Sequence, residues 1–203
     1  MAQDAPQFSV AVNNAMLDAI ETTIGTSPKW RGYTGSLPAS CAAAATGTQL
    51  VEISCPSDWA AAASGAEKAK SGTWSATASG TGTLGYYRVY DSGATTCHEQ
   101  GTITEAFPLT TSASTTSSNV LTFTSTTGVV DGSGVYATGI PDGSSVVSHT
   151  STTVTISNVA TVSSGATVLF GDVTGAMMLA ETDLTSGVTV VTISTKTYVA
   201  GNQ

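Results

Sequence analysis

Apolar residues near the start of the chain recur at helical spacing. Val12, Met16, Ile20 and Ile24 are each four positions apart, and Ala19 lies beside Ile20. Spacings of three and four place side chains on one stripe of a helix. A helix of about four turns is marginal alone in water. We therefore expect this stripe to pack on a surface, either the chain's own β domain or a partner subunit.

The ends of this helix are also marked in the sequence. Ser9 or Asn13 can cap its start, and Gly25 ends it. Asp18 and Glu21 fall outside the apolar stripe. We expect both carboxylates to face water.

From Lys29 onward, alternating apolar and polar residues predict strands. The expected strands cover residues 29–34, 49–55, 70–77, 83–90 and 96–104. A short helix is predicted over residues 57–63. The turn at Asp91–Gly93 joins the last two strands in a hairpin. In that hairpin, Tyr86, Arg88 and Tyr90 share one face.

The pattern changes after residue 106. Between Phe107 and Gly171 there is no lysine or arginine, and only Asp131 and Asp142 carry a formal charge. Short apolar runs alternate with turn-forming clusters, which predicts strands over residues 120–124, 134–137, 145–149, 153–157 and 167–170. The low-complexity stretch Thr110–Ser118 is predicted to be a surface loop or linker.

These elements predict a mainly β fold: a jelly-roll or β-sandwich domain with an N-terminal α-helix and a small inserted all-β domain. Residues 1–27 form the arm and helix, and residues 107–172 form the inserted module. Residues 28–106 together with 173–203 form a discontinuous main domain, because the tail is too short to fold alone.

The composition argues against some classes of binding partner and favours others. Of 203 residues, 10% are charged, where about a quarter is usual. The net charge is −8 and the six basic residues form no cluster. The composition therefore argues against nucleic acid and anionic membranes as partners. A surface with few ions is cheap to desolvate against another protein. Met1–Gln7 lacks the basic stretch and apolar run of a secretory signal, so we expect synthesis in the cytoplasm.

Candidate chemistry is sparse. Cys41, Cys55 and Cys97 are odd in number and irregularly spaced, so reduced thiols are expected, with a Cys41–Cys55 bridge as the alternative. Neighbouring Cys97 and His98 point to opposite faces of a strand and cannot form a nucleophile–base pair. Two histidines without metal-ligand spacing predict no metal site. We predict no catalytic residues, no cofactor and no enzymatic activity, with a hydrolase as a remote alternative.

Several segments resemble a family of small tailed-bacteriophage virion proteins. They are VNNAMLDAIETTIG at 12–25, KWRGYTGSLP at 29–38, TQLVEI at 48–53, PSDW at 56–59, KSGTW at 70–74 and GYYRVYDSGATTCHEQG at 85–101. The resemblance covers most of residues 8–105 and 174–200. NVLTF at 119–123 and GIPDG at 139–143 are similar to a module common in phage structural proteins.

The resemblance implies a structural protein on the outer surface of the virion, acting as capsid decoration, cement or a head-surface fibre. The implied partners are the major capsid protein, other virion proteins and further copies of the chain, with a trimer favoured. A tail or receptor-binding component that contacts host glycan is the alternative. The candidate interface residues are Val12, Met16, Ile20, Ile24, Trp30, Tyr86, Arg88 and Tyr90.

Overall fold

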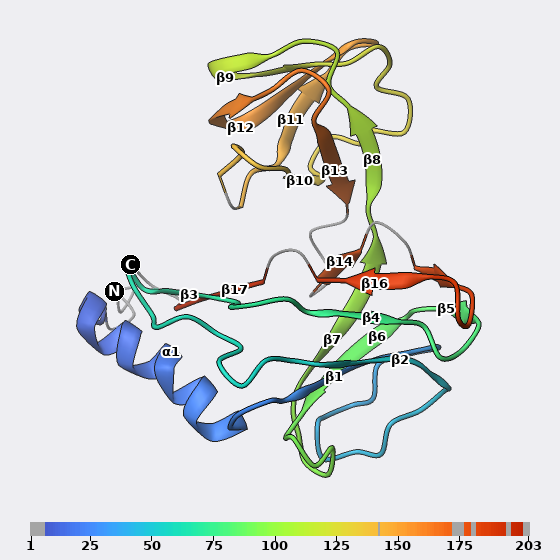
Figure 1. Cartoon of the computed structure of the whole chain (residues 1–203). Helices are drawn as coiled ribbons and strands as arrows, with labels where there is room; N and C mark the ends of the chain where they lie inside the picture. Colours follow the sequence, from blue (N-terminus) through green and yellow to red (C-terminus); the bar gives the residue numbers. More distant parts are fainter. Residues whose placement is uncertain (1–6, 142, 172–176, 180–181, 194–195, 201–203) are drawn as a thin grey trace, which may run out of the picture. The chain divides into compact units, whose positions relative to one another are not determined.

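Strands make up most of the described secondary structure, which confirms the predicted mainly β fold with one N-terminal helix and is consistent with the β-sandwich class (Figure 1). The computed structural model describes residues 7–141, 143–171, 177–179, 182–193 and 196–200. The chain divides into two compact units, which we call unit 1 (residues 1–101 and 183–203) and unit 2 (residues 102–182). The inserted module predicted over residues 107–172 lies inside unit 2.

Helix α1 spans Val10–Ile24, where the apolar spacing predicts it. Ser9 caps its start, because the serine Oγ accepts a hydrogen bond from the Val12 N–H at 3.3 Å. Gly25 ends it with a φ of 84°, a left-handed conformation that suits glycine. The Gly25 N–H donates to the Glu21 carbonyl at 2.8 Å.

The main sheet of unit 1 is built around β1 (Lys29–Tyr33). It pairs antiparallel with β2 (Gln49–Ser54) on one side and with β6 (Tyr86–Tyr90) on the other. β6 is followed in the sheet by β7 (Cys97–Glu105). The register places Trp30 opposite Ile53 and Val89, so three apolar side chains share one face.

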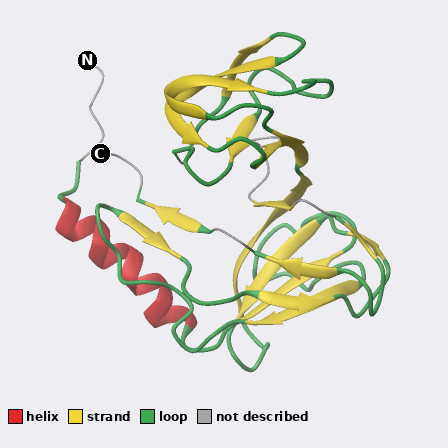
Figure 2. Ribbon diagram, turned by 45° about the horizontal axis from the view of Figure 1, so that its top comes forward, coloured by secondary structure: helices red, strands yellow, loops and turns green. Residues whose placement is uncertain are grey.

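The C-terminal part of the chain returns to unit 1 as three two-stranded ribbons. β15 (Asp183–Leu184) pairs with β5 (Gly82–Thr83), and β16 (Val190–Thr192) pairs with β4 (Ser75–Thr77). β17 (Thr197–Val199) pairs with β3 (Glu67–Ala69), and Figure 2 shows α1 alongside this last ribbon.

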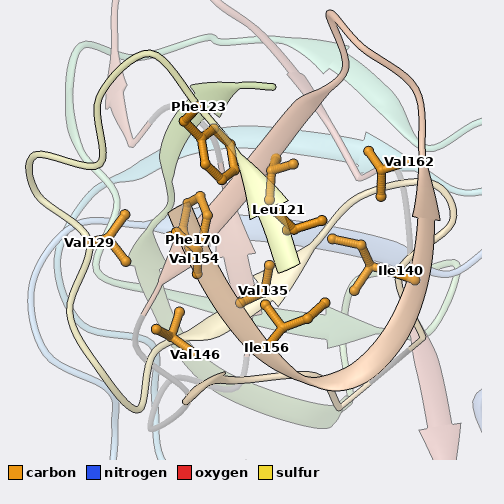
Figure 3. Packing of buried hydrophobic residues seen from close by; sticks show 12 residues of the cluster. Leu121, Phe123, Val129, Val135, Ile140, Val146, Val154, Ile156, Val162 and Phe170 are labelled. Carbon is orange, nitrogen blue, oxygen red and sulfur yellow. The ribbon is translucent and has the colours of Figure 1, made fainter. Parts of the chain in front are cut away.

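Unit 2 has two three-stranded antiparallel sheets. One has the order β10 (Gly134–Tyr136), β13 (Thr167–Gly171), β8 (Phe107–Thr110), and the other has the order β11 (Val146–His149), β12 (Thr153–Val162), β9 (Thr115–Thr122). Side chains from both sheets meet in one apolar cluster, which includes Leu121, Val154 and Phe170 (Figure 3). β14 (Met177–Leu179) runs parallel to the end of β7.

Some predicted boundaries were wrong. Residues 57–63 form no helix. The strand predicted over 83–90 is interrupted at Gly85, where an added Cβ would lie 2.0 Å from the Gly35 carbonyl oxygen. The predicted loop Thr110–Ser118 contains the start of β9, and Thr115 is buried there. Within the tail predicted to complete the main domain, residues 173–203, the positions 173–176, 180–181, 194–195 and 201–203 lie outside the described residues.

Candidate functional site

The inner face of α1 is fixed on unit 1 by apolar and polar contacts. Leu17 and Ile24 are 5% and 6% exposed. The Trp59 indole N–H donates to the Gly25 carbonyl at 2.9 Å, and the Ala66 N–H donates to the Asn14 side-chain oxygen at 2.9 Å. The helix is therefore held along its whole length.

A buried lysine adds an ionic contact. Lys68 of β3 is 1% exposed, and its ammonium lies 2.9 Å from Asp18 Oδ1 and 2.8 Å from Glu21 Oε2. It also donates to the Ala61 carbonyl at 2.7 Å. A hydrogen bond from the Ala63 N–H, together with Lys68, lowers the pKa of Asp18 below its usual range. Asp18 and Glu21 were expected to face water, and their side chains are 47% and 28% exposed. Both carboxylates also serve as counterions of the buried Lys68, which the expectation did not include.

This contact sets the orientation of the helix. The buried stripe is Asn13, Leu17 and Ile24, rather than the predicted stripe that begins at Val12 and Met16. Turning Val12 and Met16 inward would rotate Asp18 and Glu21 away from Lys68 and leave its charge buried without a partner, which is costly. The ion cluster therefore leaves the other apolar stripe uncovered.

The uncovered stripe is an apolar surface without ions. We define the outer face of α1 as the exposed residues Ala11, Val12, Ala15, Met16 and Ala19. Val12 and Met16 are 43% and 45% exposed. The only ionisable side chains of α1 are the two that contact Lys68. None of these five residues is charged, so direct contact with the outer face buries no formal charge. Asp18, whose side chain is 47% exposed, lies next to this face.

The predicted interface residues fall into two groups. Val12 and Met16 lie on the outer face of α1, and Ile20 is half-buried at its edge. The others are covered by the chain's own residues and offer little surface to a partner; they are Ile24, Trp30, Tyr86, Arg88 and Tyr90. Only the first group can contact another protein without a rearrangement of unit 1.

Three of the buried residues, Tyr86, Arg88 and Tyr90, lie beneath the loop between β1 and β2. Tyr86, Arg88 and Tyr90 share one face of the sheet, as predicted, and Tyr86 stacks on Tyr33 with ring centroids 5.1 Å apart. Arg88 is 2% exposed. Its Nη2 donates to three loop carbonyls, those of Ser40 at 2.9 Å, Cys41 at 3.1 Å and Ala43 at 2.8 Å.

Glu99 of β7 is the centre of a second polar cluster in unit 1. The Lys196 ammonium lies 2.6 Å from Glu99 Oε1, and the Tyr87 and Tyr198 hydroxyls each donate to the carboxylate at 2.6 Å. Burial raises the pKa of Glu99, but Lys196 and the hydroxyl donors outweigh this effect, so the pKa is lowered. The Glu99 carboxylate therefore connects β17 to the main sheet through Tyr198 and the preceding Lys196. We interpret this cluster as a structural one.

Metal-binding groups are absent from the part of the chain that the structure describes. The described residues contain no group of three or more His, Cys, Asp or Glu side chains that could hold a metal ion. A shallow hollow beside α1 is lined in part by Asp18, Glu21 and Asp58, but Lys68 occupies the first two carboxylates. Glycans often stack on exposed aromatic rings, but Trp30, Trp59 and Trp74 are each 0% exposed.

Sequence reasoning missed Lys68 and Glu99. A lone lysine in a short strand carries no signal by itself, although Asp18 and Glu21, three positions apart on a helix, do predict a shared cation. The Glu99 cluster joins β7 to β17 across nearly a hundred residues of sequence, and no local sequence pattern predicts a contact between segments so far apart.

Comparison of the chain with protein family models, curated proteins and solved structures found no match. None of the helices in the described part of the chain is both long and apolar enough to cross a membrane.

Proposed function

We propose that the protein is a structural component of the outer surface of a tailed-phage virion, which docks on the major capsid protein through the outer face of α1. The observation that carries the proposal is the exposed and uncharged outer face of α1. The contacts of Asp18 and Glu21 with Lys68 fix the orientation of the helix that exposes it. An apolar stripe fixed in this way gains free energy when a partner covers it. The sequence resemblance to phage virion proteins supplies the class of partner.

Substitutions on the outer face test the docking step. Phage particles would be made with the double variant Val12→Glu/Met16→Glu, and the bound chain counted by gel densitometry of purified heads. Covering an apolar side chain contributes about 1.5–3 kcal/mol, so each substitution should weaken docking roughly tenfold or more. Val188→Glu is the matched control, because Val188 is in unit 1 but outside α1 and is 73% exposed.

The two outcomes are distinct. The proposal expects Val188→Glu to remain on the heads in many copies while the double variant is lost from them but still folds, as judged by tryptophan fluorescence. Full occupancy by the folded double variant would contradict docking through α1. Absence of the unmodified chain from particles would contradict a virion role altogether.

Copy number separates the decoration role from a tail role. A head-surface protein is expected in many copies per head, whereas a tail component occurs in a handful at one vertex. We also expect homo-oligomers of the chain, with a trimer favoured, and sedimentation of the purified protein measures this directly.

A further inference from the structure

Two thiols from distant parts of the sequence meet on one face of the main sheet. Cys97 begins β7, and Cys41 lies in the loop between β1 and β2. Both residues lie around Arg88, which donates to the Cys41 carbonyl at 3.1 Å and to the Tyr90 hydroxyl at 3.3 Å. Burial raises the pKa of Cys97, and the Cys41 side chain also raises it, as a close neighbour does. The Cys97 side chain packs against the cluster of Tyr33, Tyr86 and Tyr90, and its thiol donates to the Glu99 carbonyl at 3.3 Å.

The loop that carries Cys41 is held at several points. Buried Arg88 donates to the carbonyl of Cys41 itself and to those of two neighbouring residues. The Gln100 side-chain amide donates to the Pro38 carbonyl at 2.7 Å, and the Tyr86 hydroxyl hydrogen-bonds with the backbone of Thr46. The proximity of the two thiols is therefore built into the fold of unit 1.

Cys55 is excluded from this pair by the geometry of the sheet. Val51, Ile53 and Cys55 alternate along one chain, so Cys55 lies on the face that carries Trp30, opposite the face that carries Arg88. It is 4% exposed, whereas Cys41 and Cys97 are both partly exposed. The Cys41–Cys55 bridge considered from sequence spacing is therefore wrong for this fold.

We propose that Cys41 and Cys97 are a modification site, at which a disulfide oxidant such as oxidised glutathione converts the two thiols into an intramolecular disulfide. The first thiolate attacks a glutathione sulfur and releases one glutathione thiolate. The second thiolate attacks the resulting mixed disulfide and releases the other. Two protons leave the cysteines, and two electrons pass to the oxidant. The product covalently joins the β1–β2 loop to β7.

The environment of Cys97 slows the formation of this bond. Burial raises the pKa of Cys97 to about 12, although Arg88 acts in the opposite direction. At neutral pH Cys97 is therefore almost entirely a thiol, and thiols attack disulfides far more slowly than thiolates. The three free cysteines of the structure represent the reduced form of the protein.

The purified full chain, fully reduced and then equilibrated with oxidised glutathione, provides the test. Remaining thiols would be alkylated after unfolding, and the protein digested with trypsin and a glutamate-specific protease. Trypsin alone leaves Cys41 and Cys55 on one peptide, but cleavage after Glu52 separates them. We expect a linked pair of peptides spanning residues 32–52 and 89–99, with Cys55 alkylated.

Thermal unfolding gives a second readout. Closing so long a loop should raise the melting temperature of the oxidised chain by at least about 5 °C, and a reducing agent should reverse the shift. Cys41→Ser should abolish the shift, while Cys55→Ala should retain it. The proposal is overturned if Cys41 and Cys97 both remain alkylatable after oxidation, if the bond links different cysteines, or if folded Cys41→Ser shows the same shift. These results do not depend on where the protein docks.

Discussion

The two units of this chain bury different kinds of side chain. Unit 1 encloses three tryptophans at 0% exposure, and with them Lys68 and Arg88. Unit 2 encloses an aliphatic cluster with Phe123 and Phe170. Among the residues of unit 2 that the structure describes, the buried polar side chains are hydroxyls alone; they are Thr111, Thr115, Thr126, Ser144 and Thr182.

The difference shows two ways of specifying a β fold. A buried hydroxyl is satisfied by one nearby carbonyl, as when Thr115 donates to Val120 at 3.0 Å and Ser144 donates to Pro141 at 2.6 Å. A buried cation needs several partners that converge from distant segments, as Arg88 and Lys68 have. Unit 1 should therefore be sensitive to the loss of single polar groups, and unit 2 should respond in proportion to lost apolar volume.

The largest expected effect is the loss of the Arg88 guanidinium. Arg88→Met leaves three loop carbonyls and Gln100 without their donor, so unit 1 should lose about 3–5 kcal/mol. All three tryptophans lie in unit 1, so the urea midpoint followed by tryptophan fluorescence measures this loss.

Arg31→Met is the matched control for that substitution. Arg31 lies directly opposite Arg88 in the register but is partly exposed, where it pairs with Glu52 at 2.6 Å. Loss of such a surface pair should cost about 1 kcal/mol or less. Equal effects of the two substitutions would contradict the special role of the buried cation.

An intermediate effect is expected in unit 2. Ile156 is 0% exposed inside the apolar cluster, and Ile156→Val removes one methylene group. The loss should be about 1 kcal/mol. Amide hydrogen exchange of β12 and its neighbours would report it, while the tryptophan transition should not move. A shift of that transition of the same size would show that the two units unfold together and that the comparison between them does not hold for stability.

The smallest expected effect is a loss of stability of unit 1 in acid. Glu99 and Asp18 of unit 1 have lowered pKa values in the folded chain, so they stabilise it fully above the unfolded values near 4. That contribution is lost as the pH falls through the folded values. The tryptophan-detected urea midpoint should therefore decrease below about pH 4, and Glu99→Gln should reduce the slope. An unchanged slope in this variant would remove Glu99 from the explanation.

Much of the fold could be predicted from the sequence because its signals are local. The spacing of apolar residues and Gly25 located α1, and alternation located β1, β2 and β6. Strand lengths in unit 2 were harder to predict, because serine and threonine occupy both faces of the strands. The alternation of apolar and polar residues is therefore weak there. β12 continues to Val162, five residues beyond its predicted end.

The candidate site was predictable only in part. Val12 and Met16 were named from spacing, but their exposure depends on Lys68, fifty residues from Asp18, which selects the face of α1 that turns inward. The pairing of Cys41 with Cys97 likewise depends on the loop held by Arg88. Such contacts arise from the tertiary structure and produce no periodic pattern in the sequence.

The absence of lysine from unit 2 has a practical consequence for labelling. Amine-reactive dyes and cross-linkers can modify unit 1 at Lys29 and Lys70, whereas Lys68 is enclosed. Unit 2 offers these reagents no primary amine. A lysine introduced at Val130, which is 63% exposed, would be the sole amine of that unit and would place a probe on it at one defined point.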